Sequence, residues 1–219
     1  MAKVKFLRYS EIENATLCLL AEYGRKYGDV VAPPVPVEEI LEAHLALTLD
    51  FDDLGRRIGV PDVLGATWIQ DKLVLVDQSL DPTENPPKEG RYRFTLAHEL
   101  GHWELHRHHF LADAGQPSLF GDKPKPSIVC RTSSRKEPME WQADCFAGYL
   151  LMPEDRVFRV WEQVYGSAGQ YVAFEEIEQL KARWGDERLG DTTRYRVGSA
   201  GEMTGACCVA GGFAPSFLG

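Results

Sequence analysis

Residues 98 to 102 read His98-Glu99-Leu100-Gly101-His102, and this pentapeptide constrains the fold more than any other segment. On an α-helix, residues four apart lie on one face, so both imidazoles can bind one Zn²⁺ ion. The glutamate beside the first histidine is then placed to act on water held by the metal. The motif therefore requires a helix and predicts zinc chemistry on one side of it.

The surrounding sequence favours such a helix. Apolar or small residues recur at three- and four-residue spacing, which is typical of a helix with one buried face, and no proline interrupts residues 91–109. This face consists of Phe94, Ala97, Leu100, Gly101 and Leu105. We expect three later histidines to be solvated near the end of the helix, where polar or cationic side chains suit the helix dipole. They are His106, His108 and His109.

A catalytic zinc site needs a third protein ligand and an open fourth position. His108 has the spacing used by sites in which a glycine turns the chain back toward the metal, but Leu105 occupies the position of that glycine and favours a continuing helix. Glu140 lies on a second predicted helix, residues 138–152, which begins with proline and stops at Met-Pro. Asp144 follows one turn later, so Glu140 can complete the metal shell while Asp144 accepts the free N–H of a ligand histidine. The sequence favours Glu140.

Together these motifs resemble the ImmA/IrrE family of bacterial metallo-endopeptidases, which are gluzincin-like HExxH zinc peptidases. The resemblance covers roughly residues 35 to 155. It implies that His98, His102 and Glu140 bind zinc and that Glu99 is the general base. It also implies that the substrate is a helix-turn-helix repressor, cut to relieve repression. The matching segments are residues 93–102, 130–131, 140–147 and 150–153.

We expect an α+β fold with a zincin-like metallopeptidase core. In it, a small twisted sheet packs on the HExxH helix and on a second ligand helix, with additional N- and C-terminal helices. The expected organisation is an N-terminal helix (1–31), a zinc metallopeptidase core (32–155), a C-terminal helical appendage (156–197) and a Gly-rich flexible tail (198–219).

Three smaller features refine this expectation. A capping box at residues 10–13 predicts the start of the N-terminal helix, and Gly24 predicts its end. The long segment 110–137 holds a short predicted strand around residues 127–131. The chain departs after Arg183 from the DNA-binding helical unit that family members often carry, which argues against direct DNA binding.

Residues 65–69 and 73–77 are rich in β-branched and aromatic residues around a short turn, so they predict a β-hairpin. The hairpin is either an ordinary pair of core strands or a platform on which an extended peptide substrate pairs. The second electrophile that peptide hydrolysis requires has three candidates, between which spacing does not choose. They are Tyr149, His106 and Arg131.

Bulk composition narrows the class of partner. With 219 residues, 44% hydrophobic and 26% charged, the chain is typical of globular proteins. Its net charge of −9 argues against a direct nucleic-acid partner, because phosphate contacts need a basic face. We expect no membrane segment and a cytoplasmic location. Five cysteines without a CxxC pattern agree with a reducing compartment, and we expect them to be idle thiols or small buried residues.

The leading functional hypothesis is a zinc-dependent endopeptidase that cleaves a regulatory protein, such as a repressor or antitoxin-like partner, in a stress, mobile-element or defence pathway. The alternative is a metal-bound sensor of the same fold that grips its partner without turnover, and Glu99 favours turnover because a pure binder needs no base there. A structural zinc site is disfavoured because three ligands leave one position open. Mn²⁺ fits the same ligand set. No feature of the sequence indicates an oligomeric state.

Overall fold

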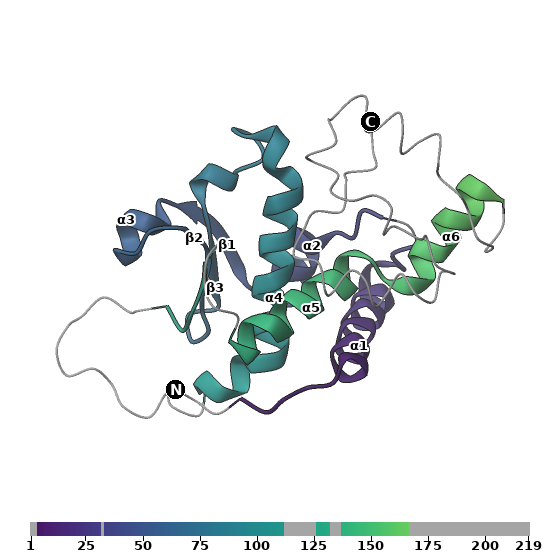
Figure 1. Cartoon of the computed structure of the whole chain (residues 1–219), viewed down its shortest axis with the longest axis horizontal. Helices are drawn as coiled ribbons and strands as arrows, with labels where there is room; N and C mark the ends of the chain where they lie inside the picture. Colours follow the sequence, from purple (N-terminus) through teal and green to yellow (C-terminus); the bar gives the residue numbers. More distant parts are fainter. Residues whose placement is uncertain (1–3, 32, 112–125, 132–136, 167–219) are drawn as a thin grey trace, which may run out of the picture. The chain divides into compact units, whose positions relative to one another are not determined.

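The computed structural model describes residues 4–31, 33–111, 126–131 and 137–166, and these form the predicted α+β fold (Figure 1). They divide into two compact units with the boundary between Pro153 and Glu154. The elements in chain order are α1 (Tyr9–Tyr27), α2 (Val37–Glu39), the π-helical turn η1 (Ile40–His44), β1 (Thr48–Asp52), α3 (Leu54–Ile58), β2 (Val63–Trp68), β3 (Leu73–Asp77), the 3₁₀ turns η2 (Gln78–Leu80) and η3 (Pro86–Lys88), α4 (Glu89–Leu111), β4 (Ile128–Arg131), α5 (Pro138–Leu151) and α6 (Glu154–Tyr165).

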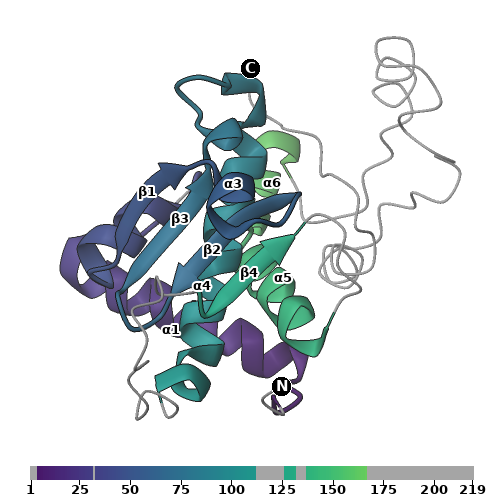
Figure 2. The same cartoon turned by 90° about the vertical axis from the view of Figure 1, so that its left-hand side faces the viewer.

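The four strands form one sheet in the order β1-β3-β2-β4 (Figure 2). The predicted hairpin is confirmed as the antiparallel pair β2 and β3, and the predicted short strand as β4, which runs antiparallel to β2. The strand β1, which pairs parallel to β3, was not predicted. Both hairpin strands therefore have neighbours on both sides, and the idea that the hairpin itself offers an edge to substrate is wrong. Within the described residues, β1 and β4 are the outer strands.

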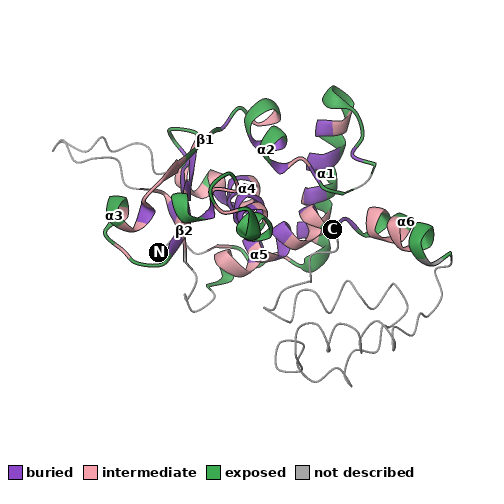
Figure 3. Cartoon of the chain, turned by 90° about the horizontal axis from the view of Figure 1, so that it is seen from above, coloured by how far each residue is buried: buried purple, intermediate pink, exposed green. Residues whose placement is uncertain are grey.

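In the first unit, α4 is the central helix and lies between the sheet and α5 (Figures 1 and 3). All nine residues from Thr95 to Trp103 are buried, so the middle of α4 has no solvated face. The expectation of one buried stripe was too narrow, because α5 covers the side that the sheet leaves open. Phe94, expected inside, is 40% exposed.

The far face of the sheet buries a separate hydrophobic cluster against α3, made of Leu54, Val63, Ala66, Trp68 and Leu75. Val129 of β4 packs against this cluster. Since neighbouring residues of a strand point to opposite faces, the residue after Val129 points toward α4.

The helices α4 and α5 approach each other closely at Gly101. A Cβ atom added there would lie 3.1 Å from the Cα and carbonyl oxygen of Ala143 and from Cβ of Phe146. Because Gly101 and Ala143 are both small and face each other, the two helices can pack closely at this point. Because Ala143 lies less than one turn after Glu140, this contact also brings the first turn of α5 to the HExxH face of α4.

The helix α1 packs on α5 and differs from the prediction at both ends. It begins at Tyr9, and Arg8 takes the N-cap position, where its N–H donates to the Glu11 carboxylate over 2.9 Å. It passes through Gly24 and ends at Gly28, whose φ of 103° few other residues tolerate. Ahead of the helix, Phe6 stacks on Trp141 of α5 at 5.7 Å between ring centroids.

The second unit contributes α6, which has two acidic residues in its first turn, as the helix dipole favours. The helix expected around residues 174–184 and the Gly-rich tail 198–219 lie outside the described residues. Among the helices described in either unit, none combines the length and apolar character needed to cross a bilayer.

Substituting Gly101 with alanine tests the close approach of α4 and α5. Adding a methyl group to this packed interface lowers the free energy of unfolding by about 1–3 kcal/mol. The higher helix propensity of alanine offsets about 1 kcal/mol of that loss. We expect Gly101→Ala to lower the free energy of unfolding measured in urea. The matched control is Gly148→Ala on α5, where an added Cβ meets nothing within 4 Å and should raise stability. A stability gain in both variants would contradict the packing described.

Candidate metal centre

Three side chains from two helices converge at the α4–α5 contact. His98 Nε2 and His102 Nε2 are 2.9 Å apart. Each lies 3.3 Å from one carboxylate oxygen of Glu140, His98 from Oε2 and His102 from Oε1. The two histidines are buried and Glu140 is partly buried. The structure therefore brings together, from segments about forty residues apart, the ligand atoms of a group that could hold a metal ion.

The partner of His98 determines where its proton sits. Its Nδ1 lies 3.0 Å from Oδ1 of Asp144, and an ionised carboxylate only accepts hydrogen bonds. Nδ1 therefore carries the hydrogen, and the Nε2 of the neutral ring presents a lone pair. Burial lowers the pKa of His98, but hydrogen bonds with Asp144, Cys130 and Glu140 outweigh it, and the net pKa lies well above its usual value. Without a metal, the groups around His98 therefore favour its protonated, positively charged form.

A longer chain of hydrogen bonds holds the second ring. His102 Nδ1 lies 3.1 Å from His106 Nδ1, His106 Nε2 lies 3.0 Å from Oε1 of Gln142, and the Gln142 amide donates to the carbonyl of Lys5 over 2.9 Å. Burial lowers the pKa of His106 to about 4, so its ring is neutral near pH 7. It donates from Nε2 and accepts at Nδ1, so His102 donates from Nδ1. The Nε2 of His102 therefore also presents a lone pair.

When both rings are neutral, two imidazole lone pairs and a carboxylate face one another. Burial raises the pKa of Glu140, but hydrogen bonds with His102 and His98 outweigh it and lower the pKa, so this carboxylate stays ionised. Without a metal, the raised pKa of His98 favours a proton on its Nε2, and a metal cation can take the place of that proton. A tetrahedral zinc ion places neighbouring N and O ligands about 3.3 Å apart, which is the separation between each imidazole and Glu140. The donor set fits a divalent cation.

Glu99 lies beside this group, with no exposed surface. Its Oε2 accepts a hydrogen bond from the Thr67 hydroxyl of β2 over 2.5 Å, and its Oε1 has no partner. Burial is the main cause of its raised pKa. The sheet makes room for this carboxylate at Gly65, where a Cβ would come within 2.5 Å of Oε1. A residue with a side chain at that position would displace Glu99.

Other candidate residues lie elsewhere. His108 is exposed, because α4 continues without a break through Leu105. The expectation that His106 is solvated was wrong: it is 0% exposed. With both ring nitrogens engaged, it is also unsuited to stabilise an oxyanion. Tyr149 is nine residues after Glu140 on α5, half a rotation from it around the helix. The third oxyanion candidate, Arg131, ends β4, and its side chain lies outside the described part of the structure.

Four neighbours of the site were missed in the sequence, namely Thr67, Gly65, Gln142 and Cys130. Gln142 sits two residues after Glu140, and His106 sits four after His102, so helical periodicity could have indicated both. Thr67, Gly65 and Cys130 reach the site from strands, and only the pairing of the sheet places them there. Cys130 was expected to be an idle thiol or a small buried residue, and its sulfur lies within 4.8 Å of a ring nitrogen of His98.

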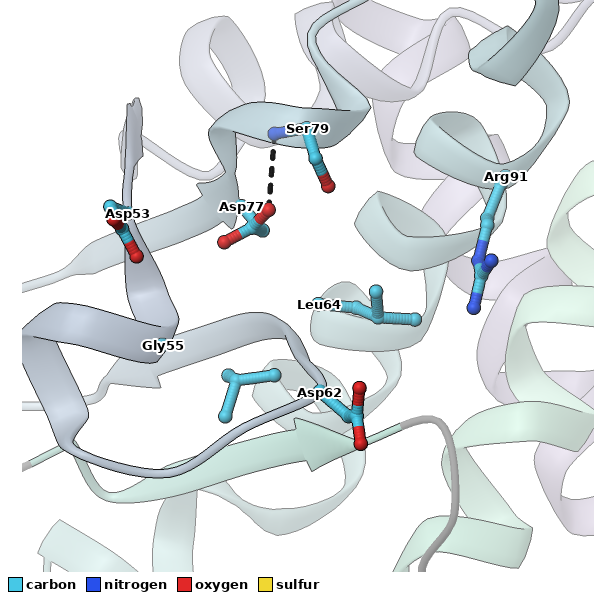
Figure 4. A pocket seen from close by; sticks show the side chains of 8 residues that line it. Asp53, Gly55, Asp62, Leu64, Asp77, Ser79 and Arg91 are labelled. Atoms are coloured by element: carbon cyan, nitrogen blue, oxygen red, sulfur yellow. Dashed lines mark hydrogen bonds between the residues drawn. The ribbon is translucent and has the colours of Figure 1, made fainter.

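A hollow of about 420 Å³ elsewhere in the first unit does not resemble this site (Figure 4). Two of its three aspartates accept backbone hydrogen bonds: Asp53 accepts from the N–H of Arg56, and Asp77 accepts from the N–H groups of Leu54 and Ser79. These two carboxylates cap the turns around α3 and η2, so local structure accounts for their positions.

Comparison with known proteins identifies a family. A peptidase family model described as IrrE N-terminal-like domain matches residues 67–185, more than half of the 219 residues. The matched range begins inside β2 and includes α4, β4 and α5, and hence all the converging side chains. No curated protein and no solved structure gives a significant match.

The hydrogen-bonded chain behind His102 can be tested with His106→Leu. The substitution leaves the His102 N–H and the Gln142 oxygen without partners, at about 1–3 kcal/mol each. We expect the metal-free protein to lose about 2 kcal/mol or more of unfolding free energy, and calorimetry to show zinc affinity about 10–100-fold weaker. The control is His108→Leu on the same helix, which should change stability by less than about 0.5 kcal/mol. Equal zinc affinities in the two variants would rule out the positioning of His102 by His106.

Proposed function

The chain belongs to the peptidase family of the IrrE N-terminal-like domain, and on that premise we propose that it is a zinc-dependent endopeptidase that cleaves a regulatory protein. The observation that carries the proposal is the convergence of two imidazole Nε2 atoms and an ionised carboxylate beside the buried Glu99. We assign His98, His102 and Glu140 as metal ligands, Glu99 as the general base, and Asp144 as the residue that orients His98. Zn²⁺ is the metal that best suits this ligand set, and Mn²⁺ is the alternative.

A divalent cation held by these ligands would act as a Lewis acid, lowering the pKa of a water and polarising a peptide carbonyl. The chain supplies the proton transfers. Glu99 has an unpartnered Oε1 and a pKa that burial raises, both of which suit a carboxylate that takes a proton from water and passes it to the leaving amine. Thr67 holds the other oxygen, so the carboxylate cannot rotate freely.

The proposed substrate is a protein, most specifically a helix-turn-helix repressor or antitoxin-like partner cut in a stress, mobile-element or defence pathway. This part rests on the family and on the net charge of −9, which disfavours a nucleic-acid substrate. The alternative is a sensor that binds its partner without turnover. Glu99 favours the enzyme, because burying a carboxylate with one unpartnered oxygen costs stability and brings no benefit to a binding module.

Glu99→Gln tests the role of the base. The amide keeps the shape and can still bind the Thr67 hydroxyl, but it cannot take a proton. We expect cleavage of the regulator encoded beside this gene, followed by gel electrophoresis, to fall about 10²–10⁴-fold, with zinc content unchanged. Cleavage at the wild-type rate would exclude the assigned mechanism. Binding of the regulator by the wild-type protein with no cleavage would favour the sensor.

Removal of the metal gives an independent test. A ligand at 100 times its dissociation constant stabilises the folded state by about 2.7 kcal/mol, so a chelator should lower the melting temperature of the zinc-loaded protein and stop cleavage. Added Zn²⁺ should restore both. His98→Ala serves as the control, since its melting temperature should not respond to the chelator. An equal response in that variant would place the metal elsewhere.

A further inference from the structure

The outer strand β4 presents a cysteine to the metal centre. Cys130 pairs with Gly65 of β2, and cross-strand partners share one face of a sheet. Gly65 faces the Glu99 carboxylate, so the thiol of Cys130 points to the same side, toward α4. Its neighbour Val129 packs on the opposite face.

The thiol of Cys130 lies close to His98, one of the three proposed metal ligands. The ligand atoms of His98, Glu99 and Cys130 all lie within 4.8 Å of one another. A thiolate in a tetrahedral zinc site lies about 3.6 Å from the neighbouring nitrogens, a spacing that falls within this limit. Two potential metal-binding groups occur among the described residues, and both contain His98. Cys130 therefore belongs to the surroundings of the same ion.

A second observation indicates that this space is built to hold a ligand. Glu99 has no exposed surface, and its Oε1 makes no hydrogen bond although it lies in the space between Gly65 and the His98 side of α4. An unpaired buried acceptor is costly, so the space suits a cation or a hydrogen-bond donor.

We propose that Cys130 is the fourth ligand of the resting metal centre and closes the position that catalysis needs open. The inference rests on the proposed metal site of His98, His102 and Glu140. On binding, the S–H bond breaks, the proton passes to solvent, and the sulfur replaces a water on the ion. The resting enzyme then has four protein ligands, the arrangement of a closed zinc site.

The position of Cys130 on β4 links the closing of the metal site to the binding of a peptide substrate. Within the described residues β4 is an outer strand, so an extended peptide can add to the sheet beside it. The residue that blocks the ion thus lies on the strand that such a peptide contacts. Release of the sulfur takes up one proton from solvent and reopens the fourth position.

Cobalt substitution tests the assignment on the full chain. Co²⁺ bound to histidine and carboxylate absorbs in the visible range, and a bound thiolate adds a charge-transfer band in the near ultraviolet. We expect one Co²⁺ per chain with both signals in the wild type and in the control Cys18→Ser, which alters an exposed cysteine on α1. Cys130→Ser should keep the visible bands, lose the charge-transfer band and bind the metal at least about ten-fold more weakly.

The outcomes separate the two proposals. Visible bands without the charge-transfer band in the wild type, or a charge-transfer band that persists in Cys130→Ser, overturn the role of Cys130 and leave the proposed peptidase intact. A wild type that binds no cobalt overturns both.

A measurement on the wild type alone covers the case in which Cys130→Ser does not fold. Iodoacetamide labelling mapped by mass spectrometry should modify Cys130 at least about ten-fold more slowly with Zn²⁺ than after chelation, since a metal-bound thiolate is shielded, while Cys18 reacts equally in both. Equal labelling of Cys130 in the two states would overturn the proposal.

Discussion

The site depends on two imidazole nitrogens and a carboxylate that the fold holds together. Asp144 orients His98, and the hydrogen-bonded series from Lys5 through Gln142 and His106 orients His102, so that the Nε2 atoms of both rings face Glu140. Asp144, Gln142 and Glu140 come from α5, whereas His106 comes from α4. The distance between α4 and α5 therefore affects the metal ligands as well as the packing of the core. The absence of a side chain at Gly101 allows this short distance.

The sheet has a different part in the arrangement. It supplies no atom to the His98, His102 and Glu140 group, but its face toward α4 is shaped around Glu99: Thr67 holds one oxygen and Gly65 leaves room for the other. The next strand carries Cys130 into the same space. The helices thus supply the proposed metal ligands. The strands hold the Glu99 carboxylate in place and, in our proposal, control the access of water and substrate to the metal.

Local patterns in the sequence predicted much of this. The HExxH spacing and the uninterrupted run around it predicted α4, and the Pro start and Met-Pro stop predicted α5, because helical geometry repeats over a few residues. The β2–β3 hairpin followed from β-branched residues around a short turn. The one-turn spacing of Glu140 and Asp144 also suggested the contact of Asp144 with a histidine. Local capping rules failed at α1, where Arg8 and Gly28 mark the ends instead of Ser10 and Gly24.

The sequence by itself therefore determined which side chains share a helical face, since that depends only on spacing along one chain segment. It did not determine which faces meet. His106 looked like a solvated residue near a helix end, yet it is fully buried, because α5 and the N-terminal segment cover it. Cys130 looked idle, yet the pairing of β4 with β2 places it beside His98. Contacts between distant segments follow from how the layers pack, and only the tertiary structure decides that.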